Sequence, residues 1–104
     1  MSDAHPFVYL MRRADGRWKI GFSSNPAARC GQLRSAFGQG FKLIRAWQRE
    51  DAYRVERLSQ QALRLYTDLS TPGRETFRAP KRVIMEALNE ALRKSDEMMK
   101  GSTT

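Results

Sequence analysis

Three polar side chains with complementary chemistry, Tyr9, Lys19 and Arg29, occur within a span of 21 residues. An arginine guanidinium presents a planar fork of donors that matches phosphate oxygens, and a lysine ammonium adds a compact positive charge. A tyrosine hydroxyl can move a proton when its surroundings favour it. These three residues could act on a phosphate group if the fold brings them together.

Two short segments around Tyr9 and Lys19 have the patterns of neighbouring β-strands. Residues 7–11 are continuously apolar, as in a central strand that is covered on both faces. Residues 17–22 alternate between apolar and polar, as in a strand with one buried face. The dipeptide Asp15-Gly16 lies between them and marks a hairpin turn. The sequence therefore predicts a β-hairpin that carries both residues.

The length of the turn decides which side chains share a face. A two-residue turn would put the apolar residues of the first segment on the same face as Lys19. A three-residue loop, residues 14–16, pairs Arg13 with Arg17 instead, and its glycine then takes the left-handed conformation. We prefer this register because a strand pair follows its buried face. One face then carries Val8, Leu10, Trp18, Ile20 and Phe22, and the other carries Tyr9, Lys19 and Gly21. This makes Tyr9 and Lys19 diagonal neighbours.

The remaining sequence predicts three helices and one further strand. Asn25 followed by Pro26 is a strong helix start, because a capping side chain precedes a proline at the first helical position. The first helix should run to about Ser35, with Arg29 one turn in and Ala27, Cys30 and Leu33 on an apolar stripe. We expect a strand over residues 41–47, a helix over 51–66 with Val55, Leu58, Ala62 and Leu65 on one side, and a helix from Pro80 to about Met99. Asp51 and Glu50 should cap the second helix.

These elements predict an α+β fold: a small three-stranded antiparallel sheet flanked by helices in the order β-β-α-β-α-α. The chain has 104 residues, enough for one modest domain. We assign residues 1–6 to a flexible N-terminal tail, residues 7–97 to the domain and residues 98–104 to a disordered C-terminal tail.

Composition favours a cytoplasmic protein with a nucleic-acid partner. Lys and Arg total 19 against 11 Asp and Glu, which gives a formal net charge of +8. Such an excess suits a phosphate backbone but does not separate an enzyme from a passive binder. The lone cysteine, Cys30, excludes an internal disulfide, and no apolar stretch approaches the ~20 residues of a membrane span. The residues most suited to nucleic-acid contact are Arg12, Arg13, Arg17, Lys19, Arg29 and Arg34.

The order of elements and the polar residues together resemble the GIY-YIG nuclease superfamily, in its short single-domain branch of phage and bacterial genomes. The resemblance covers roughly residues 7–92. Val8-Tyr9 stands at the first half of the motif, Lys19-Ile20-Gly21 at the second, and Arg29 at the arginine position of the first helix. Glu75 resembles the family's metal-binding glutamate, and Glu56 a recurrent acidic position of the branch. The departures are Phe7 for the first glycine, Lys19 for the second tyrosine, Gln60 for a histidine and Thr76 for a tryptophan.

The resemblance implies an endonuclease that hydrolyses DNA with one divalent metal ion, Mg²⁺ or Mn²⁺. Tyr9 would be the general base, Arg29 would stabilise the phosphate and Glu75 would hold the metal. Because a free tyrosine has a pKa of about 10, such a base needs positive charge nearby, which Lys19 could supply.

Other interpretations remain open. Taken alone, Tyr9 in an apolar strand is more often a core residue, and exposed lysines and arginines more often face solvent. The chain could be a catalytically silent module that binds nucleic acid or protein, or an accessory of a larger phage or defence complex. DNA is the expected partner, no membrane is expected, and a homodimer or a protein partner could supply targeting.

Overall fold

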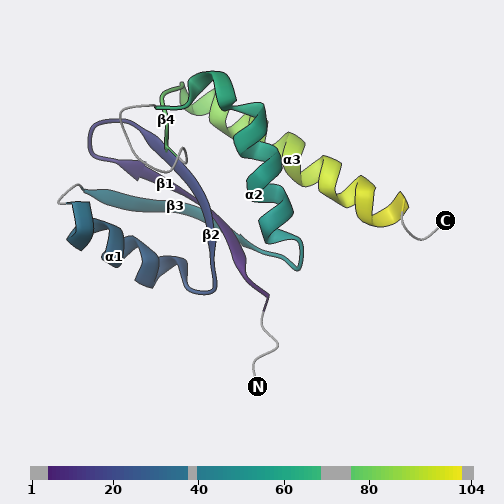
Figure 1. Cartoon of the computed structure of the whole chain (residues 1–104), viewed down its shortest axis with the longest axis horizontal. Coiled ribbons are helices and arrows are strands. Elements are labelled where there is room, and N and C mark those ends of the chain that lie inside the picture. Colours follow the sequence, from purple (N-terminus) through teal and green to yellow (C-terminus); the bar gives the residue numbers. More distant parts are fainter. Residues whose placement is uncertain (1–4, 38–39, 69–75, 102–104) are drawn as a thin grey trace.

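The computed structural model describes residues 5–37, 40–68 and 76–101 and has the expected α+β fold (Figure 1). Its sheet is antiparallel, with strand order β3-β1-β2-β4. The strands are β1 (Phe7–Arg13), β2 (Trp18–Ser23), β3 (Phe41–Gln48) and β4 (Thr76–Phe77). The fourth strand adds to the three that the sequence predicts; with two residues, it is too short to leave a pattern. Among the described residues, no helix is both long enough and apolar enough to cross a membrane.

The register of the β1–β2 hairpin is the predicted one. Tyr9 pairs with Gly21, Met11 pairs with Lys19, and the backbone N–H of Arg13 donates to the carbonyl of Arg17 at 2.8 Å. Gly16 has φ of +92°, the left-handed conformation that the three-residue loop requires. The turn therefore fixes which residues of β1 and β2 share a face.

Helices cover both faces of the sheet, and each face has its own core (Figure 1). The helices are α1 (Pro26–Phe37), α2 (Ala52–Ala62), the short 3₁₀ helix η1 (Arg64–Tyr66) and α3 (Lys81–Gly101). On one face α2 and α3 bury Val55, Ile84 and Leu88 against Val8, Leu10, Trp18 and Ile20. On the other, α1 buries Cys30 and Leu33 against Tyr9, Met11 and Phe41. The central strand β1 is thus covered on both sides, as its continuous apolar run predicts.

Several helix details differ from the expectation. The second helix ends at Ala62, and the tighter η1 turn follows, so that Leu63 is buried while Leu65 is 87% exposed. The predicted apolar stripe fails here because the helical period of 3.6 residues changes at this point. On α1, Ala27 is exposed and Pro26 is buried in its place.

Parts of both predicted tails are described, and they have regular structure or contacts with the domain. The helix α3 continues to Gly101, so residues 98–101 are helical. Near the other end, the side-chain amide of Gln48 donates to the carbonyl of His5, and the N–H of Arg49 donates to the carbonyl of Pro6. The first four residues of the predicted N-terminal tail and the last three of the predicted C-terminal tail lie outside the described residues.

A charged network joins the end of β3 to α3. Arg49 forms a two-pronged ion pair with Asp51, at 2.6 and 2.9 Å, and also pairs with Asp96. The buried hydroxyl of Ser95 donates to Asp51. Asp51 occupies the cap position of α2, but its side chain makes no hydrogen bond to that helix, contrary to the expected capping role. The hydrogen bonds from Arg49 lower the pKa of Asp51 from 3.8 to about 2.

We expect Asp51→Asn to destabilise the fold by about 1–3 kcal/mol at neutral pH, because a charge-assisted network is broken. The lowered pKa of Asp51 makes this contribution complete above about pH 4, and it is lost as the pH falls through about 2. Urea unfolding of wild type and variant should therefore converge in acid. Asp96→Asn, at the exposed partner of the same arginine, is the control and should cost less. An equal difference at every pH would contradict this account.

Candidate active site

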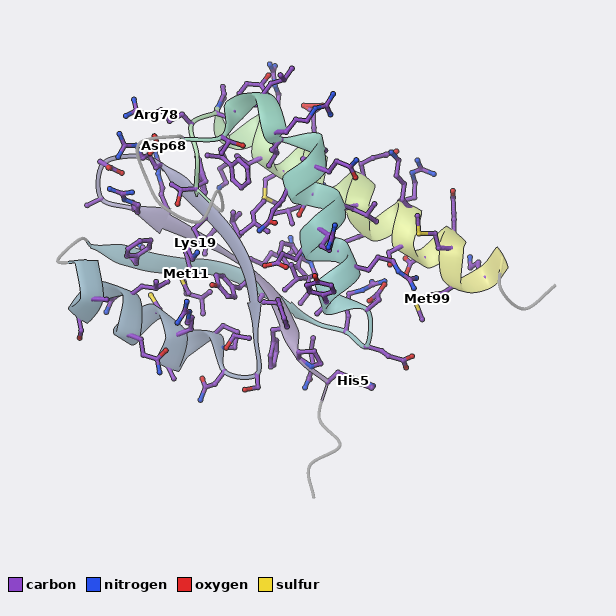
Figure 2. The ribbon with its side chains drawn as sticks, in the orientation of Figure 1. His5, Met11, Lys19, Asp68, Arg78 and Met99 are labelled. Carbon is purple, nitrogen blue, oxygen red and sulfur yellow. The ribbon has the colours of Figure 1, made fainter. Side chains whose placement is uncertain are left out.

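Tyr9 and Lys19 lie on the α1 face of the hairpin as diagonal neighbours. Both are buried, and Tyr9 is only 1% exposed. The tyrosine ring is part of the small core beneath α1, while Lys19 stands directly opposite Met11 on the adjacent strand (Figure 2). The predicted diagonal placement of Tyr9 and Lys19 on one face is therefore present, and Tyr9 also has a packing role.

Gly21 is required by the position of Tyr9. A Cβ atom at residue 21 would stand 2.4 Å from the Tyr9 hydroxyl oxygen and 2.6 Å from the ring carbon that bears it. The phenol therefore lies across the backbone of β2, with its hydroxyl over Gly21. The glycine at this motif position has a local explanation, since any side chain would displace the Tyr9 ring.

The helix α1 carries Arg29 on the flank that faces away from β3. The side-chain oxygen of Asn25 accepts from the N–H of Ala28 at 3.1 Å, which confirms the predicted helix start. Arg34 follows Arg29 by five residues, which places the two side chains about 140° apart around the helix axis. Arg34 donates to the carbonyl of Phe41 at the start of β3. Arg29 is therefore exposed on the opposite flank of α1 from β3.

The fourth predicted site residue, Glu75, lies outside the described residues. The next residue in the sequence, Thr76, is buried and pairs directly with Lys19. The N–H of Asp68 donates to the carbonyl of Thr76 at 2.8 Å, and the N–H of Arg78 donates to the carbonyl of Tyr66 at 2.9 Å. The chain on both sides of residues 69–75 is thus fixed next to the Lys19 end of β2.

Asp68 fixes this region further, although the sequence alone does not mark it as important. Its buried carboxylate is 2.9 Å from Arg17 Nε and 3.9 Å from Arg78 Nε (Figure 2). Removing one partner of an ion pair that is buried to this degree strongly destabilises the fold, because the other charge is left without its partner. Asp68 belongs to no motif, and its opposite charge to Arg17 was the only signal available in the sequence.

Gln60 and Glu56 belong to α2, across the sheet from α1. The side-chain amide of Gln60 donates to the carbonyl of Ile20 at 2.9 Å. Along an antiparallel strand pair, hydrogen-bonded residue pairs alternate with pairs that make no hydrogen bonds to each other. Arg13 and Arg17 form a hydrogen-bonded pair, so Leu10 and Ile20, three pairs further along, do not. The carbonyl of Ile20 therefore points away from β1, toward the other edge of β2. Glu56 is buried one turn earlier in α2. Gln60, which replaces the expected histidine, therefore reaches the edge of the strand that carries Lys19.

The predicted nucleic-acid contacts do not share one face. Arg12 stacks over Trp18 at 4.9 Å, on the face opposite Lys19. Arg13 pairs with Asp15 at 2.9 Å, Arg17 with Asp15 and Asp68, and Arg34 with the backbone of Phe41. These partners give the last three arginines a role within the fold. Arg12 and Arg29 are exposed, and Lys19 lies with Tyr9.

The described residues contain no group of three or more His, Cys, Asp or Glu side chains that could hold a metal ion. A protein cage for a metal is therefore absent from this part of the chain. A single carboxylate with water and phosphate oxygens would still suit Mg²⁺, which keeps several waters and often takes only one or two carboxylates.

Residues 6–92 match the T5orf172 domain, and because the match covers most of the sequence, the chain belongs to the T5orf172 domain family. This domain is phage-associated and related to nucleases of the GIY-YIG and HNH-like kinds. No curated protein and no solved structure is significantly similar to the chain.

We expect Gly21→Ala to destabilise the protein by about 1–3 kcal/mol, since the new methyl group must displace the Tyr9 ring. Combining it with Tyr9→Leu should cost less than the sum of the two single changes, because the shorter side chain vacates the space. Urea unfolding of the four proteins measures this coupling.

Gly31→Ala is the matched control, because nothing described lies within 4 Å of a Cβ atom at that helical position. It should stabilise the protein by about 0.5–1 kcal/mol through helix propensity. If the losses in unfolding free energy from Gly21→Ala and Tyr9→Leu simply add in the double variant, the two positions are not in steric contact, which would contradict this account.

Proposed function

We propose that the chain is a metal-dependent endonuclease of the GIY-YIG type that hydrolyses phosphodiester bonds in DNA. The observation that carries the proposal is the placement of Tyr9 and Lys19 as diagonal neighbours on one face of the hairpin, with the Tyr9 hydroxyl over Gly21. Family membership supports the nuclease class.

The residues suit the demands of the reaction. Hydrolysis of a phosphodiester needs an activated water, neutralisation of charge on the phosphate and help for the leaving oxygen. In the proposal, Tyr9 acts as the phenolate, whose oxygen takes the proton of the attacking water and so becomes the neutral phenol. Lys19 on the neighbouring strand supplies the positive charge that such a phenolate needs. Arg29, exposed on α1, would fork onto two oxygens of the phosphate as charge builds there.

Glu75 would hold a single Mg²⁺ or Mn²⁺ ion, which supplies Lewis-acid stabilisation of the phosphate when it is bound. Support for this assignment comes from the sequence: Glu75 adjoins Thr76, and Thr76 pairs with Lys19. The fixed chain around residues 69–75 suits a residue that must meet a phosphate near that lysine.

A second candidate function is a catalytically silent domain that binds nucleic acid through its positive charge. The burial of Tyr9 favours it, because a tyrosine in a core cluster has a packing role without any chemistry. Such a domain could serve as an accessory in a larger phage or defence complex. A second copy of the chain or a protein partner would then direct it to its target.

The test is nicking of supercoiled plasmid by purified protein with Mg²⁺, with Mn²⁺ or with EDTA. We expect metal-dependent nicking that falls roughly 100-fold or more in Arg29→Ala, which removes charge stabilisation. Tyr9→Phe keeps the ring and removes only the hydroxyl, and should lose roughly 100- to 10,000-fold. Glu75→Gln should lose the response to metal.

Arg82→Ala, at an exposed arginine of α3, is the matched charge control and should nick as the wild type does. Nicking that persists in both Tyr9→Phe and Arg29→Ala would refute the proposed site. An inactive wild type that still retains DNA, and releases it as salt rises, would establish the binding domain instead.

A further inference from the structure

Two aromatic rings form an exposed pair where the end of β2 meets the start of α2. Phe22 is 44% exposed and Tyr53 is 52% exposed. Their ring centroids are 5.2 Å apart and their planes meet at 68°, an edge-to-face contact. Single exposed apolar residues are ordinary on a protein surface, whereas contiguous exposed apolar groups attract interest as interaction sites.

An arginine completes this surface. Arg57, one turn after Tyr53 on α2, places its guanidinium carbon 5.7 Å from the centre of the tyrosine ring and donates to the tyrosine hydroxyl at 3.2 Å. Aromatic faces accept stacked bases of any sequence, and a neighbouring guanidinium attracts the phosphate backbone. The surface made by Phe22, Tyr53 and Arg57, here called the aromatic platform, thus combines both features of single-strand recognition.

The aromatic platform adjoins the candidate active site through β2. Phe22 directly follows Gly21, over which the Tyr9 hydroxyl lies, and the two residues face opposite sides of the sheet. In the described part of the chain, β4 pairs with β2 only at Trp18 and Lys19. The edge of β2 at Phe22 has no neighbouring strand there, so no strand separates the aromatic platform from the opposite face of β2 at this position.

We propose that the aromatic platform stacks an unpaired base of a nucleic-acid strand whose phosphate lies on the Tyr9 and Lys19 face. The platform would make the chain prefer single-stranded or unstacked nucleic acid over an intact duplex. In a duplex, the neighbouring bases stack on both faces of each base, so neither face is available to the platform. The net charge of +8 and Arg57 at the platform favour a polyanion over a neutral apolar peptide as the occupant. This inference rests on the proposed function for the position of the phosphate.

The test measures binding in EDTA, where cleavage does not interfere. A fluorescein-labelled single strand of about 12 nucleotides and its duplex are titrated with protein, and anisotropy is followed. We expect the single strand to bind more tightly than the duplex, and Tyr53→Ala to weaken single-strand binding roughly tenfold. Tyr53→Phe keeps the ring and should retain most of the affinity.

Tyr66→Ala is the matched control, because Tyr66 is 40% exposed on η1, which follows the end of α2 opposite to Tyr53. It should bind as the wild type does, and thermal unfolding verifies that each variant is folded. Equal single-strand affinity in Tyr53→Ala and wild type would overturn the platform, as would an equal loss in Tyr66→Ala or a preference for duplex. Platform-dependent binding without any nicking would keep this inference and refute only the proposed reaction.

Discussion

The register of the β1–β2 hairpin is the constraint on which the rest of the structure depends. Side chains alternate along a strand, so a slip of one residue would move Tyr9 to the opposite face from Lys19. The three-residue turn, with Gly16 at φ of +92°, holds the pairing that keeps them together. The same register sorts the apolar residues of both strands onto the face that α2 and α3 cover.

The two faces of the sheet then have different characters. The larger core beneath α2 and α3 is the main source of apolar burial, while the smaller core beneath α1 includes Tyr9 itself. The candidate site is therefore built into the lesser core, where Gly21 leaves space for the phenol. On the side of Lys19 away from β1, ion pairs and backbone bonds around Asp68 and Thr76 fix the start of β2.

The sequence predicted the parts of this arrangement that local patterns determine. Apolar alternation and an Asp-Gly turn were enough for the hairpin register, and Asn25-Pro26 was enough for the start of α1. What the sequence missed depends on contacts between distant segments. Asp51 meets Arg49 and Ser95 instead of its own helix, and Asp68 gains its role only when it meets Arg17. The basic residues likewise lie on both faces of the sheet, and the acidic, aromatic and backbone groups that they contact cannot be read from their spacing in the sequence.

The central claim is that the hairpin and α1 present one face that handles a phosphate. The most direct measurement is the change in backbone amide NMR signals when a short DNA single strand is added in EDTA. The account predicts that the changes concentrate at Lys19, Gly21 and Arg29, together with Phe22 and Tyr53 of the aromatic platform, and are absent from the end of α3. Changes confined to α3, with the hairpin signals unmoved, would contradict it.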